Sequence, residues 1–431
     1  MHTFQIFSAL ILLVAVFGYL NQRFVKLPDA IGMAAIGTLV SVAAIALAHF
    51  DTSLADRMRV TVAAVDFSEI MLHSLLGLLL FAGSLEVDLA QVRKEKWLIL
   101  GLATFGVLMS TVLVGMAFFL VSRWLSLGVP LVYCLLFGAL ISPTDPVAVL
   151  SALRQVGVPT SLEARIAGES LFNDGTAVVA YLTLLGLASG NASITVASTL
   201  QLFATEVLGA IAFGLAVGYV AFRMLRRVDS YSVEILITLA LATAGYAAAE
   251  AAGVSAPIAV VLMGLMVGDR GRREAMSAET RQRLFGFWQV LDELLNLLLF
   301  GFIGLEMMTV SFSAVQAGAG LAGIAIVLLA RLASVGAPVW LTPRLRKYQR
   351  PATVIMTWGG LRGGISIALA LSLPEFPGRA AVISTTYAVV IFSILVQATS
   401  LQRIARRVLP PAPGPGASQA DTADQAARPG R

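Results

Sequence analysis

Residues 168–175, with the sequence GESLFNDG, place two carboxylates inside an apolar segment that continues to about Gly190. That segment is long enough to cross a bilayer as a helix. A carboxylate costs about 2.5 to 3.5 kcal/mol at the centre of a membrane helix. Glu169 and Asp174 are therefore expected to face protein rather than lipid. They indicate a site that handles protons, cations or both, the alternative being a structural ion pair in a packed bundle.

The composition is that of a polytopic membrane protein. Hydrophobic residues make up 58% of the 431 residues and charged residues only 13%, whereas soluble domains carry about 25% charged residues. The formal net charge of +5 is spread over many short loops, so it does not indicate a nucleic-acid partner. The single cysteine, Cys134, excludes an intrachain disulfide.

Apolar stretches of suitable length predict an all-α fold of about thirteen transmembrane helices in a lipid bilayer. They fall near residues 4–21, 28–50, 66–85, 98–121, 130–152, 163–189, 199–222, 233–252, 255–268, 284–310, 319–342, 352–373 and 380–401. Residues 1–409 are thus predicted to form one transmembrane domain. Residues 410–431 are rich in Pro, Gly and small polar residues, and this composition predicts a disordered tail.

The basic residues give an orientation. Alternate loops, counted from the end of the first predicted span, hold 19 Lys and Arg residues, and the opposite loops hold four. The side that is rich in Lys and Arg is expected to be cytoplasmic. This predicts a multi-pass protein of the plasma (inner) membrane with its N-terminus outside and its C-terminal tail in the cytoplasm. Four tryptophans near span ends are expected to anchor the helices at the membrane–water interface: Trp97, Trp124, Trp288 and Trp340.

The fifth predicted span contains an interruption, ISPTDPV, at residues 141–147. Pro143 and Pro146 remove two backbone donors and cannot both lie in an unbroken helix. Asp145 can cap a new helix that starts at Pro146. The span is therefore predicted to be two half-helices that meet in the middle of the membrane, with free carbonyl groups near residues 142–144 that suit a cation.

The twelfth predicted span contains a second interruption, where Gly359, Gly360, Gly363 and Gly364 surround Arg362. Four glycines disfavour a continuous helix, and irregular backbone at this depth must be buried in protein or line water. If spans 1–6 and 8–13 are two repeats, the two broken helices occupy corresponding positions. That arrangement is typical of secondary transporters with inverted repeats.

An ion site is predicted where the sixth span passes the break in the fifth. Asp174 and Ser170 are four residues apart and share a helix face. With the carbonyl group of Thr144, they would offer hard oxygen ligands to Na⁺ or another small cation. The sequence contains no Cys/His cluster to indicate a transition metal. A carboxylate that binds either a proton or a cation, but not both, is sufficient for antiport.

Glu169 has two candidate partners. Arg331 and Arg362 lie inside predicted spans, and each needs an anionic or carbonyl partner within the bundle. We expect Glu169 to neutralise one of them, and at this point either arginine remains possible.

Other carboxylates lie at the ends of predicted spans. Asp292 and Glu293 begin the tenth span after a basic loop and are interpreted as interfacial charges. Glu86 and Asp88 follow the third span and are interpreted as charges of a solvated loop. None of the four is predicted to belong to the site.

Three sequences together, GESLFNDG at 168–175, SPTDPV at 142–147 and WGGLRGGIS at 358–366, resemble the monovalent cation:proton antiporter-1 family, the NhaP-type sodium/proton exchangers. The resemblance covers roughly residues 5–405. It implies a homodimer of thirteen-span protomers, each with a dimerisation part and a mobile core of six helices. It also implies electroneutral exchange of one Na⁺ or Li⁺ for one H⁺ by alternating access, with no cofactor.

The resemblance also implies roles for residues at the predicted site. Asp174 would be the carboxylate that binds the ion and exchanges the proton, and Asn173 would complete the Asn-Asp pair of electroneutral members. Ser170 and Thr144 would be ligands. Asp145 would act through water or as a helix cap.

Two further roles follow from the same resemblance. Glu169 would pair with Arg331. Arg362 would balance the partial charges of the helix ends at the crossing in the twelfth span. One departure concerns the third span, where some relatives carry an acidic ligand and this chain has LLFAGS at residues 79–84. The resemblance therefore does not fix the cation, and a K⁺/H⁺ antiporter of the same family is an alternative.

Two other classes of protein fit the sequence less well. An intramembrane aspartyl protease would usually contain the tetrapeptide Gly-x-Gly-Asp, which is absent, and Ser170 has no evident His partner for a serine protease. A passive cation channel would not need a buried arginine and glutamate beside the ion carboxylate. We therefore expect a transporter and not an enzyme.

Overall fold

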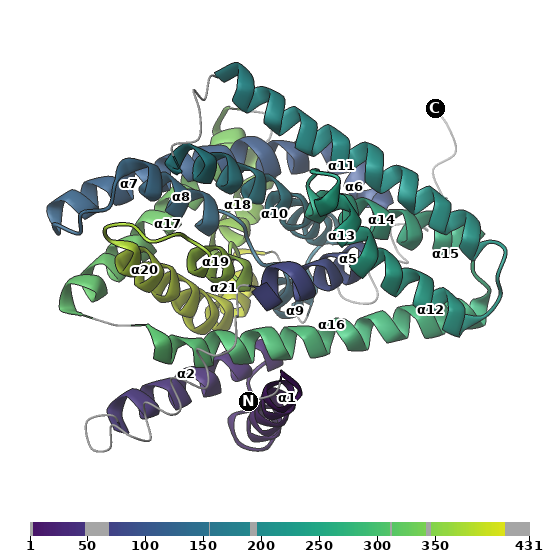
Figure 1. Ribbon diagram of the computed structural model, residues 1–431, viewed down its shortest axis with the longest axis horizontal. Helices are drawn as coiled ribbons and strands as arrows, with labels where there is room; N and C mark the ends of the chain where they lie inside the picture. Colours follow the sequence, from purple (N-terminus) through teal and green to yellow (C-terminus); the bar gives the residue numbers. More distant parts are fainter. Residues whose placement is uncertain are drawn as a thin grey trace, which may run out of the picture.

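The computed structural model describes residues 3–47, 69–154, 156–189, 196–310, 313–341 and 346–409. All regular structure within these residues is helical, in agreement with the predicted fold class (Figure 1). The tail predicted at residues 410–431 lies outside the described residues.

The helices form a bundle in which α16 runs along one side and α1 and α2 lie against it (Figure 1). Within the bundle, α10 packs against α6, α8 and α14. The helices are α1 (Thr3–Leu20), α2 (Asp29–Leu47), α5 (Leu76–Glu86), α6 (Leu89–Gly101), α7 (Val107–Trp124), α8 (Leu131–Ile141), α9 (Val147–Arg154), α10 (Thr160–Ala188), α11 (Val196–Leu225), α12 (Tyr231–Ala240), α13 (Tyr246–Ala251), α14 (Ala256–Met266), α15 (Arg272–Glu274), α16 (Ala278–Glu306), α17 (Ala314–Leu341), α18 (Arg346–Trp358), α19 (Gly364–Leu371), α20 (Arg379–Phe392) and α21 (Thr399–Val408).

Eight helices among the described residues are long and apolar enough to cross a membrane. Shorter apolar helices, at Ile11–Val25, Leu76–Glu86 and Leu131–Ile141, fall below that length. One of the eight spans Leu89–Trp124 and joins α6 to α7 through a π-helical turn at Leu102–Gly106. The chain is therefore a multi-pass membrane protein.

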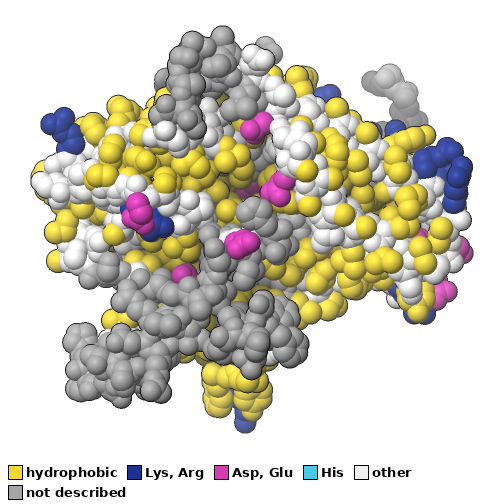
Figure 2. Space-filling model, viewed as in Figure 1, with side chains coloured by type: hydrophobic (Ala, Val, Ile, Leu, Met, Phe, Trp, Pro, Cys, Tyr) yellow, Lys and Arg dark blue, Asp and Glu magenta, His cyan; other side chains and the backbone are white. Residues whose placement is uncertain are grey.

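The outer surface is apolar, as expected of helices that face lipid. Figure 2 shows a face dominated by hydrophobic side chains, with Lys and Arg mostly near its edges. Trp97 and Trp124 are 79% and 82% exposed, which suits interfacial anchors. The same prediction was wrong for Trp288, which is 2% exposed because its indole N–H donates to the Thr238 hydroxyl at 2.9 Å inside the bundle.

Small residues bring α2 and α16 into close contact. A Cβ on Gly304 would lie only 2.7 Å from the carbonyl oxygen of Ala34, so this position requires glycine. The Ser41 hydroxyl donates to the Gly304 carbonyl at 2.7 Å, which adds an interhelical hydrogen bond. Close backbone approach and such hydrogen bonds are what hold helices together in lipid. The pair α2–α16 is therefore a tightly packed unit on one side of the bundle.

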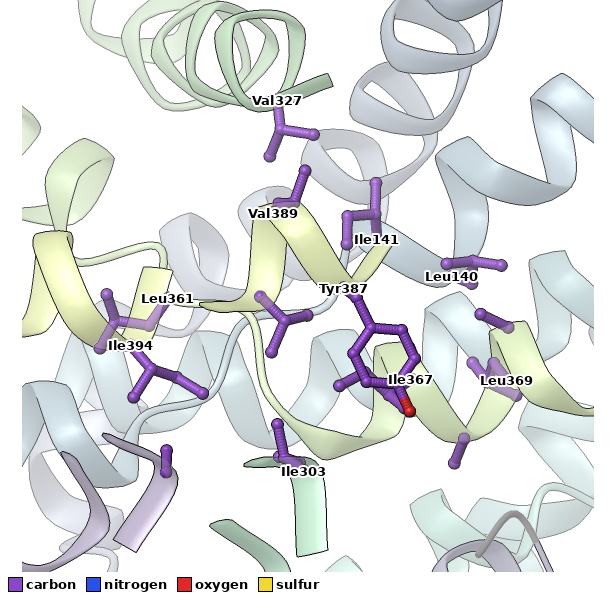
Figure 3. Close-up of a cluster of buried hydrophobic side chains, with 14 of the residues drawn as sticks. Leu140, Ile141, Ile303, Val327, Leu361, Ile367, Leu369, Tyr387, Val389 and Ile394 are labelled. Atoms are coloured by element: carbon purple, nitrogen blue, oxygen red, sulfur yellow. The ribbon is translucent and has the colours of Figure 1, made fainter. Parts of the chain in front are cut away.

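A hydrophobic cluster packs around the interrupted segments (Figure 3). Ile141 comes from the end of α8, Val327 from α17, Ile367 from α19, and Tyr387 and Val389 from α20. All five side chains are at most 4% exposed. The cluster fixes the half-helices against the neighbouring long helices.

Candidate ion-binding site

Two irregular segments cross beside α10. One joins α8, which ends at Ile141, to α9, which begins at Val147. The other joins α18, which ends at Trp358, to α19, which begins at Gly364. A backbone hydrogen bond of 2.8 Å from the N–H of Asp145 to the carbonyl of Leu361 connects the two segments. Irregular backbone at both places is thus paired inside the protein.

Asp145 lies at the centre of this crossing. Its Oδ1 accepts a hydrogen bond from the backbone N–H of Val147 at 2.9 Å, as expected of a residue that caps α9. The first helical residue is Val147 and not Pro146, although the Pro146 carbonyl accepts the first helical hydrogen bond, from Leu150, at 2.7 Å. A Cβ on Gly363 would lie 2.5 Å from Asp145 Oδ2, so only glycine lets this carboxylate approach the second segment.

Polar residues of α10 hold the first irregular segment in place. The Ser170 hydroxyl donates to the carbonyl of Thr144. The Asn173 side-chain amide donates to the Thr144 hydroxyl at 2.8 Å. These three side chains are 0–6% exposed. The structure therefore brings together Ser170, Asn173 and Thr144, which the sequence had placed in one site.

Asp174 lies beside this cluster and faces a cavity. Its side chain is 6% exposed, and among the described residues its carboxylate has no hydrogen-bond partner. The cavity has a volume of about 1060 Å³, and Thr144, Asp145 and Ser170 also line it. A buried carboxylate that lines a cavity together with a hydroxyl and a carbonyl group can bind either a proton or a small hard cation.

The cavity reaches the molecular surface, since exposed residues such as Gln22 and Asp29 line it. Its described lining also includes Glu86, Asp88, Glu163, Asp292 and Glu293. The interpretation of four of these, Glu86, Asp88, Asp292 and Glu293, as loop or interfacial charges missed that they line this cavity. The reason is that α5 and α16 contact each other across a sequence separation of about 200 residues.

Glu169 pairs with Arg331. The Arg331 guanidinium donates from Nη1 to Oε1 at 2.5 Å and from Nη2 to Oε2 at 3.0 Å, which is the bidentate geometry that makes such pairs strong. Glu169 is 2% exposed and Arg331 8%. A Cβ on Gly360 would lie 2.7 Å from Arg331 Nε, so the glycine leaves room for the guanidinium. The pair joins α10 to α17 and touches the irregular segment after α18.

Arg362 takes a different partner, the carbonyl end of α8. Its Nη1 donates to the carbonyl of Ser142 and, at 2.8 Å, to that of Pro143. The guanidinium thereby satisfies groups that a helix C-terminus leaves unpaired and balances their partial negative charge. The expectation of free carbonyls at residues 142–144 was therefore wrong, because Arg362 and Ser170 already donate to all three. The Thr144 carbonyl has a second lone pair, so it can still contact a cation.

Some contacts at the crossing could not be predicted. The Ser393 hydroxyl accepts a hydrogen bond of 2.8 Å from the backbone N–H of Arg362. The carbonyl of Leu361 accepts from Asp145. A serine within the last apolar segment was a weak signal for the first contact, and nothing in the sequence indicated the second.

Comparisons with known proteins agree with one another. The family model "Sodium/hydrogen exchanger, transmembrane" matches residues 11–407. The Na(+)/H(+) antiporter NhaP of Pseudomonas aeruginosa is 44% identical over 406 residues, which cover 93% of this chain and 96% of that protein. The Na(+)/H(+) antiporter NhaH of Halobacillus dabanensis is 31% identical over 417 residues, covering 95% and 99%.

The fold also has a counterpart among solved structures. The sodium proton antiporter MjNhaP1 from Methanocaldococcus jannaschii superposes with a TM-score of 0.71 at 19% identity, covering 95% of this chain and 99% of that one. At this level of identity the match shows the fold alone. The family is shown by the family model and the two relatives, and the structural match agrees with it. The chain belongs to the transmembrane sodium/hydrogen exchangers of the monovalent cation:proton antiporter-1 family.

Proposed function

We propose that this protein is a secondary active antiporter that exchanges Na⁺ for H⁺ across the plasma membrane and so serves pH and sodium homeostasis. The observation that carries the proposal is the position of Asp174, a buried carboxylate that lines an acidic cavity. Family membership supports the same chemistry. No cofactor is needed, because the driving force is the gradient of either ion.

Asp174 is proposed to bind the two ions in turn. A charged carboxylate is costly away from water, so the site is stable when it holds a proton or a cation and unstable when it holds neither. Each exchange then moves one positive charge in each direction. This supports an electroneutral cycle with one Na⁺ for one H⁺.

The proposed sodium ligands are the Asp174 carboxylate, the Ser170 hydroxyl and the Thr144 carbonyl. Hard oxygen atoms of these kinds suit Na⁺ and Li⁺. Asn173 orients the Thr144 hydroxyl through the hydrogen bond of 2.8 Å. Asp145 holds the first turn of α9 and contacts the ion through water or not at all.

The Glu169–Arg331 pair and Arg362 are proposed to be structural. Glu169 already uses both carboxylate oxygens in its bidentate contact. Arg362 balances the partial negative charge at the C-terminal end of α8. None of the three belongs to the described lining of the cavity, so none is placed to bind a transported ion there.

The proposed transport cycle is alternating access. It assumes thirteen spans, with inverted repeats of spans 1–6 and 8–13, in a homodimer. The interruptions at α8/α9 and α18/α19 would be the broken fifth and twelfth helices. The cavity reaches the ends of helices next to Arg23, Lys26 and Arg154, which belong to the loops predicted to be cytoplasmic. The described conformation would then be open to the cytoplasm.

The test is exchange by purified protein in liposomes that contain a pH-sensitive dye. Addition of Na⁺ should move protons in the wild type, and Asp174→Asn should reduce the rate at least 100-fold. Glu279→Gln, which removes a carboxylate from an exposed pair with Arg283, is the control and should exchange normally. Undiminished exchange by Asp174→Asn would refute the proposed role.

The same assay identifies the cation. Na⁺, Li⁺ and K⁺ are added in turn at equal concentration. Na⁺ and Li⁺ should drive proton movement at concentrations where K⁺ drives little. A stronger response to K⁺ would identify a K⁺/H⁺ antiporter instead.

A further inference from the structure

Arg154 is unusual among the described residues that line the cavity. It supplies the single basic side chain in that lining. Eight carboxylates share the cavity with it: Asp29, Glu86, Asp88, Asp145, Glu163, Asp174, Asp292 and Glu293. A transported cation therefore enters a strongly acidic space that already holds one tethered positive charge.

The contacts of Arg154 are too loose to explain it as a structural residue. Its Nη2 lies 3.6 Å from Glu86 Oε2, and its Nε lies 3.9 Å from Glu163 Oε2. The Arg154 side chain is 57% exposed and that of Glu86 is 50% exposed. Exposed ion pairs with such geometry contribute little to stability. The arginine is thus free to act through its charge.

Arg154 lies close to the ion site along the chain. It is the last residue of α9, the eight-residue helix whose first turn is capped by Asp145. A helix of this length spans about 12 Å. This distance exceeds the Debye length of about 8 Å at physiological salt but is well below the value of about 30 Å at 0.01 M salt, so the charge of Arg154 acts on the ion site most strongly at low ionic strength.

A positive charge in this cavity weakens the electrostatic field of its carboxylates. Carboxylates in a cleft with low-dielectric walls raise the local concentration of cations. A guanidinium remains charged at every relevant pH, so Arg154 cancels part of that field. Na⁺ and H⁺ are both depleted in proportion, because both carry one positive charge.

We propose that Arg154 sets the apparent affinity for cations on the open side of the cavity by acting as a tethered counter-charge to its carboxylates. It does so without touching the transported ion. This inference rests on the proposed function, since it assumes that Na⁺ and H⁺ reach Asp174 through the cavity.

The test uses everted membrane vesicles, in which added Na⁺ meets the cytoplasmic side. Two unit charges about 10 Å apart in water or at half its dielectric constant alter a local concentration by about two- to fourfold. Arg154→Gln should therefore lower the apparent KM for Na⁺ by about two- to fourfold in low salt, with the maximal rate unchanged. The pH at which protons inhibit by half should rise in parallel.

Three comparisons separate a field effect from a structural one. Arg154→Lys keeps the charge and should match the wild type. Arg273→Gln removes an arginine that is similarly exposed, at 61%, and pairs with Asp269 outside the cavity, so it should change nothing. With 0.5 M choline chloride present, the difference between Arg154→Gln and the wild type should disappear.

Glu86→Gln supplies an independent variant if Arg154→Gln does not reach the membrane. Removal of this carboxylate should raise the apparent KM by a similar factor in low salt. An unchanged KM in Arg154→Gln, a change that persists in high salt, or an equal change in Arg154→Lys would overturn the inference. If the wild type itself shows no Na⁺-driven proton movement, the proposed function is refuted. That result is distinct from a failure of the Arg154 inference, because it is seen without any variant.

Discussion

At the scale of single residues, the two carboxylates of α10 have opposite environments. Glu169 is fully engaged by a bidentate arginine, whereas Asp174, five residues later, faces a cavity and has no partner among the described residues. The difference follows from their positions on the helix, because residues five apart point to different sides. One side meets α17, and the other meets the irregular segment between α8 and α9.

Loss of Glu169 should destabilise the protein because it leaves a buried arginine without its counter-charge. Breaking a buried ion pair costs about 3 to 5 kcal/mol, whereas replacement of both partners by apolar residues can be nearly neutral. We expect Glu169→Gln to lower the thermal unfolding temperature in detergent markedly. The double variant Glu169→Leu, Arg331→Met should recover most of the loss. Equal destabilisation of the single and double variants would argue against the pair as the cause.

Asn173→Asp should make exchange sensitive to voltage. The substitution adds a second carboxylate beside Asp174, and a site that binds two protons against one Na⁺ moves net charge. We would impose a membrane potential on liposomes with K⁺ and valinomycin and follow the rate of exchange. The wild type, which we propose to be electroneutral, should not respond, and the absence of any response in the variant would exclude this role for Asn173.

At the scale of elements, proline and glycine in the sequence indicated where helices stop, but not what their ends would meet. Helix α8 ends at Ile141, the first residue of the predicted interruption at 141–147, and α19 begins at Gly364, the last glycine of the predicted Gly-rich one. These boundaries follow from local backbone chemistry. Some partners of those ends come from residues more than 200 positions away, as with Arg362 and Ser142. No pattern within one segment encodes such a contact.

Gly363→Ala should impair exchange while sparing the fold. The added methyl group would lie 2.5 Å from Asp145 Oδ2 and must displace that carboxylate or separate the two segments. We expect a fall in exchange rate of at least tenfold, measured in liposomes. Gly286→Ala in α16 is the control, since a Cβ there meets no atom within 4 Å. The idea fails if both variants exchange at the wild-type rate.

At the scale of the whole molecule, composition and hydropathy predicted an all-helical membrane protein, and the structure agrees. Charge counting predicted an orientation in the membrane, and contacts within the chain do not test it. The cavity could not be predicted, because Glu86, Glu163 and Asp292 belong to three helices that only the tertiary fold brings together. Each of those residues, taken alone, resembles an ordinary charge at the end of a span.

Accessibility of introduced cysteines should reveal the orientation and the open side. The native Cys134 is buried, so the wild type should react little with a membrane-impermeant maleimide. Gln289→Cys lies on the cavity lining and should react in everted vesicles but not in intact cells. Glu375→Cys, at a side chain that is 88% exposed between α19 and α20, should show the reverse. Labelling of both from the same side would contradict the proposed topology.

The hydrogen bond between Asp145 and Leu361 has a mechanical consequence. It ties the backbone of one interrupted segment to that of the other, while Ser170 and Asn173 tie the first segment to α10. These hydrogen bonds favour movement of the three parts together. If Na⁺ binds as proposed, its oxygen ligands can then move as one rigid unit, so the ligands need not rearrange relative to one another while the site changes the side of the membrane to which it opens.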